Sequence, residues 1–166
     1  MAVLIAIPIL GVLAILQSSL VSRLPLLQGT PDLLMLAIIA WALQKRVQTA
    51  WQWSIIGGLV VSFYSAVPIG VYMIGYGLTT GLALVLRRRV WQVPILAMFL
   101  VTFLGTLIIQ SITLLALRLI GSTITVLDAL NLIMLPSILL NLLFAIPVYA
   151  IFNELAGWLY PEEIEV

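Results

Sequence analysis

The sequence contains no cysteine and no histidine in its 166 residues. Without cysteine there can be no disulfide bond, no thiolate metal site and no cysteine nucleophile. Without histidine the chain lacks the most common general base and the most common metal ligand. Charged residues are also scarce, at 8% of the chain, against about 25% in soluble domains. These absences argue against an enzyme, and we expect no cofactor and no metal site.

What the sequence does contain is mostly apolar: 64% of its residues are hydrophobic and the mean hydropathy is +1.28. Such a chain cannot cover a water-facing surface, which predicts a polytopic membrane protein in contact with the lipid bilayer. At about 20 residues per spanning helix, the length accommodates roughly six spans and no soluble domain. The formal net charge of +1 gives no electrostatic reason to expect a nucleic-acid partner.

We predict an all-α fold in which residues 1–166 form a single transmembrane domain, a bundle of six helices. The expected spans are residues 2–21, 31–46, 51–65, 69–86, 93–119 and 136–160. The first is predicted to be a retained span and not a signal peptide, because it has no basic start and no small-residue cleavage pattern. Trp51 and Trp53 are predicted to form an interfacial aromatic belt at the start of the third span.

The distribution of basic residues predicts the orientation, because short loops rich in Lys and Arg stay on the cytoplasmic side. The second and fourth loops hold five such residues, namely Lys45, Arg46, Arg87, Arg88 and Arg89. The other loops hold only Arg23, and Arg118 ends the fifth span. This asymmetry places both termini in the cytoplasm, in agreement with an even number of spans.

The first loop lies in the segment QSSLVSRLPLLQGTPDLLML at residues 17–36, the densest early group of polar residues. Thr30 can cap the next helix, Pro31 suits the first helical position, and Asp32 faces the positive end of the helix dipole. Arg23 and Asp32 are candidates for an interfacial ion pair, worth up to about 1 kcal/mol. We therefore expect the segment to turn and cap the chain at the outer interface.

A charge at mid-depth in the membrane is costly and usually functional. The acidic and basic residues near the spans, such as Asp32, Arg118, Asp128 and Glu154, all fall within a turn or two of a predicted helix end. We therefore expect no charge deep in the membrane. This disfavours an ion-coupled transporter, a proton pump and an intramembrane hydrolase.

Uncharged polar residues do occur within the spans. Thr102, Thr106, Gln110 and Thr113 recur at a spacing that puts them on one face of the fifth span. They can make hydrogen bonds between helices of the bundle, at about 0.6–2 kcal/mol each, or form a contact face for a partner or small ligand. Asn141 in the sixth span, which also contains Pro147, is a further candidate of the same kind.

Three further features each leave alternatives open. Gly77 and Gly81, four residues apart, can mediate close packing inside the bundle or contact with a partner. The cluster Arg87 to Arg89 can set the topology or contact anionic lipid or a cytoplasmic partner. Residues 121–135, with a capping-box pattern from Thr125 to Asp128, can form an interfacial amphipathic helix or extend the sixth span.

Several stretches, in their order along the chain, resemble the bacterial rod shape-determining protein family MreD. They are LQSSLVSRLPLLQGTPDLLML at 16–36, SAVPIG at 65–70, RRR at 87–89 and LPSILLNLLFAIPVYAIFNEL at 135–155. The similarity covers nearly the whole chain. The chain departs from the family at Ser62, which ends the stretch Gly58-Leu-Val-Val-Ser62 where the family commonly has an aspartate.

The resemblance implies a non-catalytic component of the cell-shape complex, or elongasome, in the bacterial cytoplasmic (inner) membrane. Such a protein binds the bitopic protein MreC and supports peptidoglycan synthesis during rod elongation, alongside MreB, RodA and the transpeptidase partner of RodA. The family is similar in fold to the six-helix S-components of energy-coupling-factor transporters. The alternative is therefore an S-component-like binder of a vitamin or other small molecule, which would need a polar pocket near the outer face.

Overall fold

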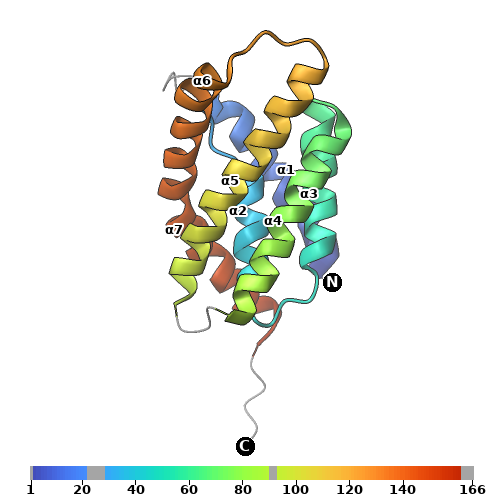
Figure 1. Ribbon diagram of the computed structural model, residues 1–166. Helices are drawn as coiled ribbons and strands as arrows, with labels where there is room; N and C mark the ends of the chain where they lie inside the picture. Colours follow the sequence, from blue (N-terminus) through green and yellow to red (C-terminus); the bar gives the residue numbers. More distant parts are fainter. Residues whose placement is uncertain (1, 22–28, 90–92, 162–166) are drawn as a thin grey trace, which may run out of the picture.

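The computed structural model describes residues 2–21, 29–89 and 93–161 (Figure 1). The helices are α1 (Ala2–Val21), α2 (Leu33–Leu43), α3 (Ala50–Tyr64), α4 (Ile69–Arg89), α5 (Pro94–Leu119), α6 (Val126–Asp128), the π-helical η1 (Ala129–Met134) and α7 (Leu135–Leu159). The described residues contain no strand, so the predicted all-α fold is confirmed. Three stretches, Ile69–Arg88, Pro94–Leu119 and Val126–Leu159, are long and apolar enough to cross a membrane.

The long helices lie side by side, and successive helices run in opposite directions (Figure 1). We call the lower end of the bundle in Figure 1 the basic end, because α2 and α4 end there. Lys45 and Arg46 follow the end of α2, and Arg87 and Arg88 lie in the last turn of α4. The first helix begins and the last helix ends toward the basic end. The loops between α3 and α4 and between α5 and α6 lie at the opposite end.

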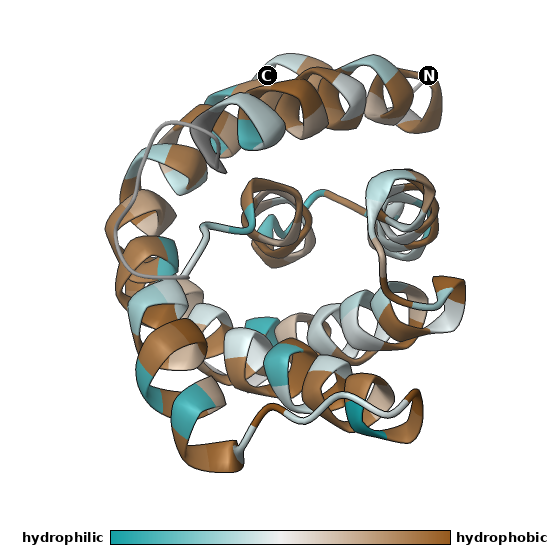
Figure 2. Cartoon of the chain, turned by 90° about the horizontal axis from the view of Figure 1, so that it is seen from above, coloured by the Kyte–Doolittle hydropathy of each residue, from teal (hydrophilic) through white to brown (hydrophobic). Residues whose placement is uncertain are grey.

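The helices are largely hydrophobic along their lengths (Figure 2), and many large apolar side chains are exposed on the outside of the bundle. Phe63 is 88% exposed, and Leu139 and Leu143 on α7 are each 69% exposed. Soluble monomers rarely expose contiguous apolar surface of this extent. The exposed face of α7 therefore has the character of a lipid-facing surface, which supports a membrane protein.

The helix α2 lies inside the bundle, and all eleven of its residues are buried. It packs against α1, α3, α4, α5 and α7. Its sequence LLMLAIIAWAL is apolar on every side, as a helix enclosed by other helices requires. At 1.5 Å per residue it is about 16 Å long, roughly half the thickness of the hydrocarbon core. One end of α2 must therefore lie within the bundle.

An aromatic cluster fixes the other end of α2. The rings of Trp41 and Trp53 stack with their centroids 4.5 Å apart, and Phe152 of α7 contacts both edge-on. The Trp41 indole donates a hydrogen bond to the Thr49 hydroxyl over 3.2 Å. Trp53 is fully buried in this cluster. The prediction that Trp53 belongs to an interfacial belt is therefore wrong, whereas Trp51 is exposed.

The last helical stretch is longer than one span of average length. α6, η1 and α7 follow one another without a break from Val126 to Leu159. The capping box is present, because the Thr125 hydroxyl accepts a hydrogen bond from the Asp128 N–H over 3.1 Å. For residues 121–135 the sequence allowed an interfacial amphipathic helix or an extension of the sixth span. The structure shows the extension, which begins at Val126. A π-helical segment joins the two parts.

Candidate functional site

The N-terminus of α2 is capped by a carboxylate inside the bundle. The Asp32 Oδ1 atom accepts a hydrogen bond from the Met35 N–H over 2.9 Å and another from the Tyr76 hydroxyl over 2.7 Å. The first four N–H groups of any helix lack partners within it. In a membrane interior no water replaces them, so other polar groups must supply the acceptors. Asp32 meets this need at the start of α2.

The partners of Asp32 come from the interiors of long helices. Tyr76 lies about two turns into α4, and Asn141, whose Oδ1 accepts from the Asp32 N–H over 2.7 Å, lies about two turns into α7. Thr106, whose hydroxyl accepts a hydrogen bond from the Asn141 side chain, lies midway along α5. The prediction that Asp32 caps a helix start is confirmed, and the helix that it caps starts among α4, α5 and α7. Its position at the membrane interface stays a prediction.

Side chains of other helices complete the cap. The Gln17 Oε1 atom of α1 accepts a hydrogen bond from the Leu33 N–H over 2.8 Å. The Ser137 hydroxyl of α7 accepts one from the Thr30 N–H over 3.1 Å. Thr30 was expected to be the cap, but the cap is Asp32, and Thr30 is bound through its backbone. Gln17 thus serves a helix that starts 16 residues later.

The polar face predicted on α5 points into this region. The Asn141 Nδ2 group donates to the Thr106 hydroxyl over 3.0 Å, and that hydroxyl donates to the Thr102 carbonyl over 2.7 Å. Gln110 Nε2 lies 3.5 Å from the Ser137 hydroxyl. Of the two interpretations left open, hydrogen bonding within the bundle is confirmed for Thr106 and Asn141. The Thr102 hydroxyl is buried and has no hydrogen-bond partner among the described residues.

We call Gln17, Asp32, Tyr76, Thr106, Ser137 and Asn141 the capping network. The network joins five helices. Four of its side chains accept from backbone N–H groups at the start of α2, namely Gln17, Asp32, Ser137 and Asn141. Within residues 2–21, 29–89 and 93–161, no group of three or more acidic, histidine or cysteine side chains is placed to hold a metal ion. The hydrogen bonds of the network hold the start of α2 against its neighbouring helices.

The predicted interfacial arginines have separate positions. Arg23 lies outside the described residues, and so does its expected ion pair with Asp32. The Arg87 guanidinium donates from Nη1 to the carbonyls of Gln44 and Val47, over 2.8 and 2.9 Å. Arg88 is exposed, and Arg89 ends α4 with a side chain outside the described part. Arg87 therefore ties the end of α4 to the loop that follows α2.

Gly77 and Gly81 are not at the closest helix contacts. A Cβ atom added at Gly77 would have no neighbour within 4 Å, and one at Gly81 would lie 3.5 Å from the Trp51 ring. The tight contacts between α4 and α5 are at Gly75, whose Cβ would lie 2.8 Å from Ile109, and at Gly105. Close packing is therefore wrong for Gly77, which has open space where a Cβ would be added, whereas Gly81 is in ordinary contact with Trp51 of α3. Contact with a partner stays a prediction for them.

Ser62 closes the turn between α3 and α4. Its hydroxyl is buried and lies 2.6 Å from the Gly58 carbonyl oxygen and 2.9 Å from the Ile69 carbonyl oxygen. Both neighbours are acceptors, so this position requires a donor. A carboxylate here would face two carbonyl oxygens.

We expect Ser62→Asp to destabilise the protein more than Ser62→Ala does. The alanine variant loses hydrogen bonding worth about 1 kcal/mol, whereas the aspartate variant adds the cost of a buried charge without a donor. Thermal unfolding in detergent, followed by circular dichroism, measures both variants. Equal melting temperatures for the aspartate variant and the wild type would contradict this role of Ser62.

Comparison of the chain with protein-family models, with curated proteins and with solved structures finds no match.

Proposed function

We propose that this protein is a non-catalytic, multi-pass component of the bacterial cytoplasmic membrane that binds an MreC-like bitopic protein in the cell-elongation complex. In this proposal the chain makes six crossings, with the basic end and both termini in the cytoplasm. MreB, RodA and the transpeptidase partner of RodA act in the same complex. The resemblance of the ordered stretches to the MreD family motivates the proposal, and the surface between α1 and α7 supports it.

The supporting observation is an apolar groove that opens on the side of the bundle. It has a volume of about 410 Å³ and lies between the first and last helices. Its lining residues are Pro8, Ile9, Val12, Leu13, Val148, Ile151, Phe152 and Leu155. We call it the lateral groove. A partner that crosses the membrane once presents a helix of apolar side chains, and such helices associate by close packing in lipid.

The use of the interior polar groups also supports a non-catalytic function. Asp32 is held by the Met35 N–H and the Tyr76 hydroxyl, and Asn141 bridges Asp32 to Thr106. Here the carboxyl group completes the start of α2, so a structural function accounts for it.

The alternative, an S-component-like binder of a small molecule, needs a pocket at the end opposite the basic end. The pocket there between α5 and η1, lined by residues such as Gln110, Thr113 and Met134, has a volume of about 70 Å³. Sites for drug-sized ligands are usually about 300–1,000 Å³. This difference favours the partner-binding proposal over the small-molecule binder.

A co-purification experiment tests the proposal. The protein is co-expressed with an MreC-like bitopic protein, and the complex is isolated in mild detergent. We expect the wild type to retain the partner, and Ile151→Trp, which fills the lateral groove, to reduce the retained amount several-fold. Leu143→Trp is the matched control, because Leu143 is exposed on the same helix and does not line the groove.

The outcomes separate the two functions. Retention of the partner by Leu143→Trp but not by Ile151→Trp supports the proposal. A wild type that fails to retain the partner, or that co-purifies with a vitamin and an ATPase module, contradicts it. Equal loss in both tryptophan variants would contradict the assignment of the partner to the lateral groove.

A further inference from the structure

An open groove of about 490 Å³ lies between the start of α3 and the end of α4, at the basic end of the bundle. Its lining residues are Trp51, Gly81, Leu84, Val85 and Arg88. We call it the α3–α4 groove. It shares no lining residue with the lateral groove, so it is a separate surface of the bundle.

Gly81 leaves space in the α3–α4 groove. A Cβ atom added at Gly81 would lie 3.5 Å from the Trp51 ring, so even the first carbon of a side chain would reach van der Waals contact with α3. Trp51 and Val85 also line the groove, and both are exposed. Sites for small ligands usually have volumes of about 300–1,000 Å³. The groove therefore has room for a head group and the first part of an acyl chain.

One exposed cation, Arg88, lines the groove. No hydrogen bond or ion pair of its side chain is present within residues 2–21, 29–89 and 93–161. Its charge repels that of Arg87, whose guanidinium donates to the uncharged carbonyl groups of Gln44 and Val47. The described residues that line the groove include no acidic side chain. An anionic group bound beside Arg88 would therefore relieve the repulsion between the two arginines.

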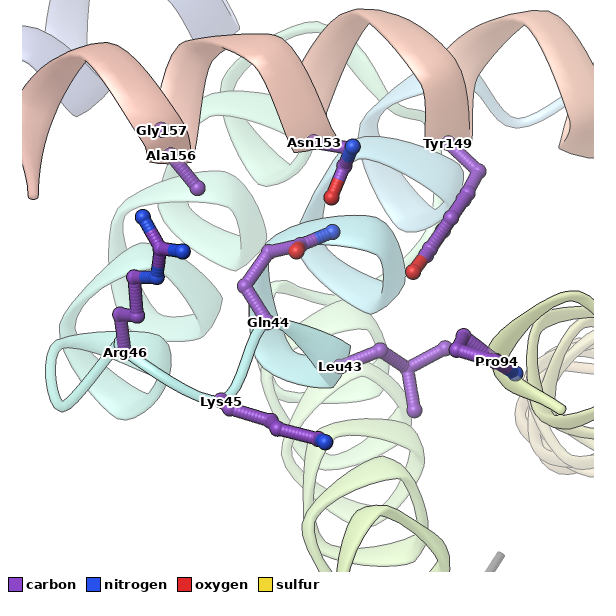
Figure 3. Close-up of a pocket in the computed structure, with 9 residues that line it drawn as sticks. All are labelled: Leu43, Gln44, Lys45, Arg46, Pro94, Tyr149, Asn153, Ala156 and Gly157. Carbon is purple, nitrogen blue, oxygen red and sulfur yellow. The ribbon is translucent and has the colours of Figure 1, made fainter. Parts of the chain in front are cut away.

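A neighbouring pocket at the same end differs in this respect. It has a volume of about 390 Å³ and lies between α2, α5 and α7, with Lys45 and Arg46 at its edge (Figure 3). The Arg46 guanidinium donates to the Tyr160 carbonyl over 2.9 Å, and Lys45 also has an interaction partner. The basic side chains of that pocket are thus engaged within the protein, whereas Arg88 is available to a ligand.

The exposed side of α4 continues the groove toward the middle of the bundle. Ile74 and Leu78 are exposed, and their spacing from Gly81 and Val85 puts all four residues on one side of the helix. From Val85 to Ile74 this side is about 16 Å long. Ile55, one turn beyond Trp51 on α3, is exposed as well. An apolar chain that leaves the groove would therefore meet apolar side chains along its length.

We propose that the α3–α4 groove binds one anionic phospholipid. The phosphate lies against the Arg88 guanidinium at the membrane surface, and one acyl chain passes over Gly81 and lies along Leu78. Basic pockets between membrane helices bind anionic head groups, and tryptophan is enriched at the depth of the head groups. An anionic lipid matches both the charge and the apolar side of α4, whereas a soluble phosphate leaves the apolar side uncovered.

Native mass spectrometry of the full chain in detergent, titrated with phosphatidylglycerol or with phosphatidylcholine of the same acyl chains, tests the site. We expect the wild type to prefer phosphatidylglycerol. Arg88→Gln is expected to weaken phosphatidylglycerol binding about fivefold, the factor that corresponds to about 1 kcal/mol for one basic residue, and to remove most of the preference. Glycerol phosphate, which has the charge without acyl chains, is expected to bind more weakly than phosphatidylglycerol.

Two variants fill the groove and keep Arg88. Val85→Trp and Gly81→Leu are each expected to weaken the binding of both phospholipids several-fold, without changing the preference between them. Val85 is exposed, so its replacement tests the groove even if Gly81→Leu were to impair folding. Wild-type phosphatidylglycerol binding by Val85→Trp would overturn the proposal. So would an unchanged preference in Arg88→Gln, or glycerol phosphate binding as tightly as the lipid.

Matched controls come from other surfaces of the bundle. Arg118→Gln removes an exposed cation at the opposite end, and Leu143→Trp enlarges an exposed side chain of α7 away from the α3–α4 groove. Both variants are expected to bind phosphatidylglycerol like the wild type. Losses in these controls equal to those in Arg88→Gln and Val85→Trp would overturn the site.

A helix in the α3–α4 groove would give a different result from a lipid. The oligomeric state and the retained amount of the bitopic partner are measured on the same preparations of Val85→Trp. We expect both to equal those of the wild type, because the partner is assigned to the lateral groove. Loss of the partner or of a dimer, with phosphatidylglycerol binding unchanged, would overturn the proposal, since a helix would then be the occupant.

Discussion

Replacing Asp32 with alanine is expected to lower the free energy of unfolding by about 2–4 kcal/mol. Loss of an N-cap acceptor costs about 0.5–2 kcal/mol, and a buried hydroxyl left without an acceptor costs about 1–3 kcal/mol more. Here the orphaned groups are the Met35 N–H and the Tyr76 hydroxyl, both inside the bundle. Unfolding by SDS in mixed micelles, followed by circular dichroism, measures the loss.

A second aspartate provides the control for the position of Asp32. Asp128 also lies at a helix start, where its N–H is bound by Thr125, but its side chain is exposed. Asp128→Ala is therefore expected to change stability by no more than about 0.5 kcal/mol. Equal losses in Asp32→Ala and Asp128→Ala would contradict the interior position of the cap.

Asparagine at position 32 separates the hydrogen-bonding role from the charge. An asparagine side chain keeps an oxygen that can accept from Met35 and Tyr76, and asparagine is a good N-cap residue. We expect Asp32→Asn to retain most of the stability that Asp32→Ala loses. If the two variants were equally unstable, the negative charge of Asp32, and not its capping geometry, would be the stabilising feature.

The capping role of Asp32 could be predicted from the sequence, but its depth could not. The pattern Thr-Pro-Asp before an apolar run marks a helix start wherever that helix lies. The run LLMLAIIAWAL is as apolar as a lipid-facing helix. Apolar residues that face lipid and those that face protein look alike, because no hydrophobic force distinguishes them in a bilayer. Only the packing of five neighbouring helices shows that α2 is central and short.

Helix boundaries, in contrast, follow closely from local signals. The predicted span 2–21 coincides with α1, and 93–119 differs by one residue from α5. Proline at the first position of α5 and the glycine just beyond its C-cap Ile120 give clear start and stop signals. Gly121 has the positive φ of 98° that favours glycine there. The contacts of Gln17 with residue 33 could not be predicted, because they depend on how α1 packs on α2.

Replacing Gly75 with leucine is expected to destabilise the bundle by about 2–3 kcal/mol, because overpacking a filled interior typically costs about 1–3 kcal/mol. A Cβ atom at this position would lie 2.8 Å from Cγ1 and 3.7 Å from Cα of Ile109, which is itself buried. The rest of a leucine side chain would push α4 away from α5. The melting temperature and the monodisperse fraction in detergent measure the effect.

Gly77 is the matched control, because it lies two residues further along α4 and has open space where a Cβ would be added. Gly77→Leu is therefore expected to unfold like the wild type. If Gly77→Leu were as unstable as Gly75→Leu, the outward orientation of Gly77 would be wrong. If it were stable but retained less of the bitopic partner, the loss would assign Gly77 to the partner surface. Stability and partner retention, measured on the same two variants, thus separate packing inside the bundle from contact outside it.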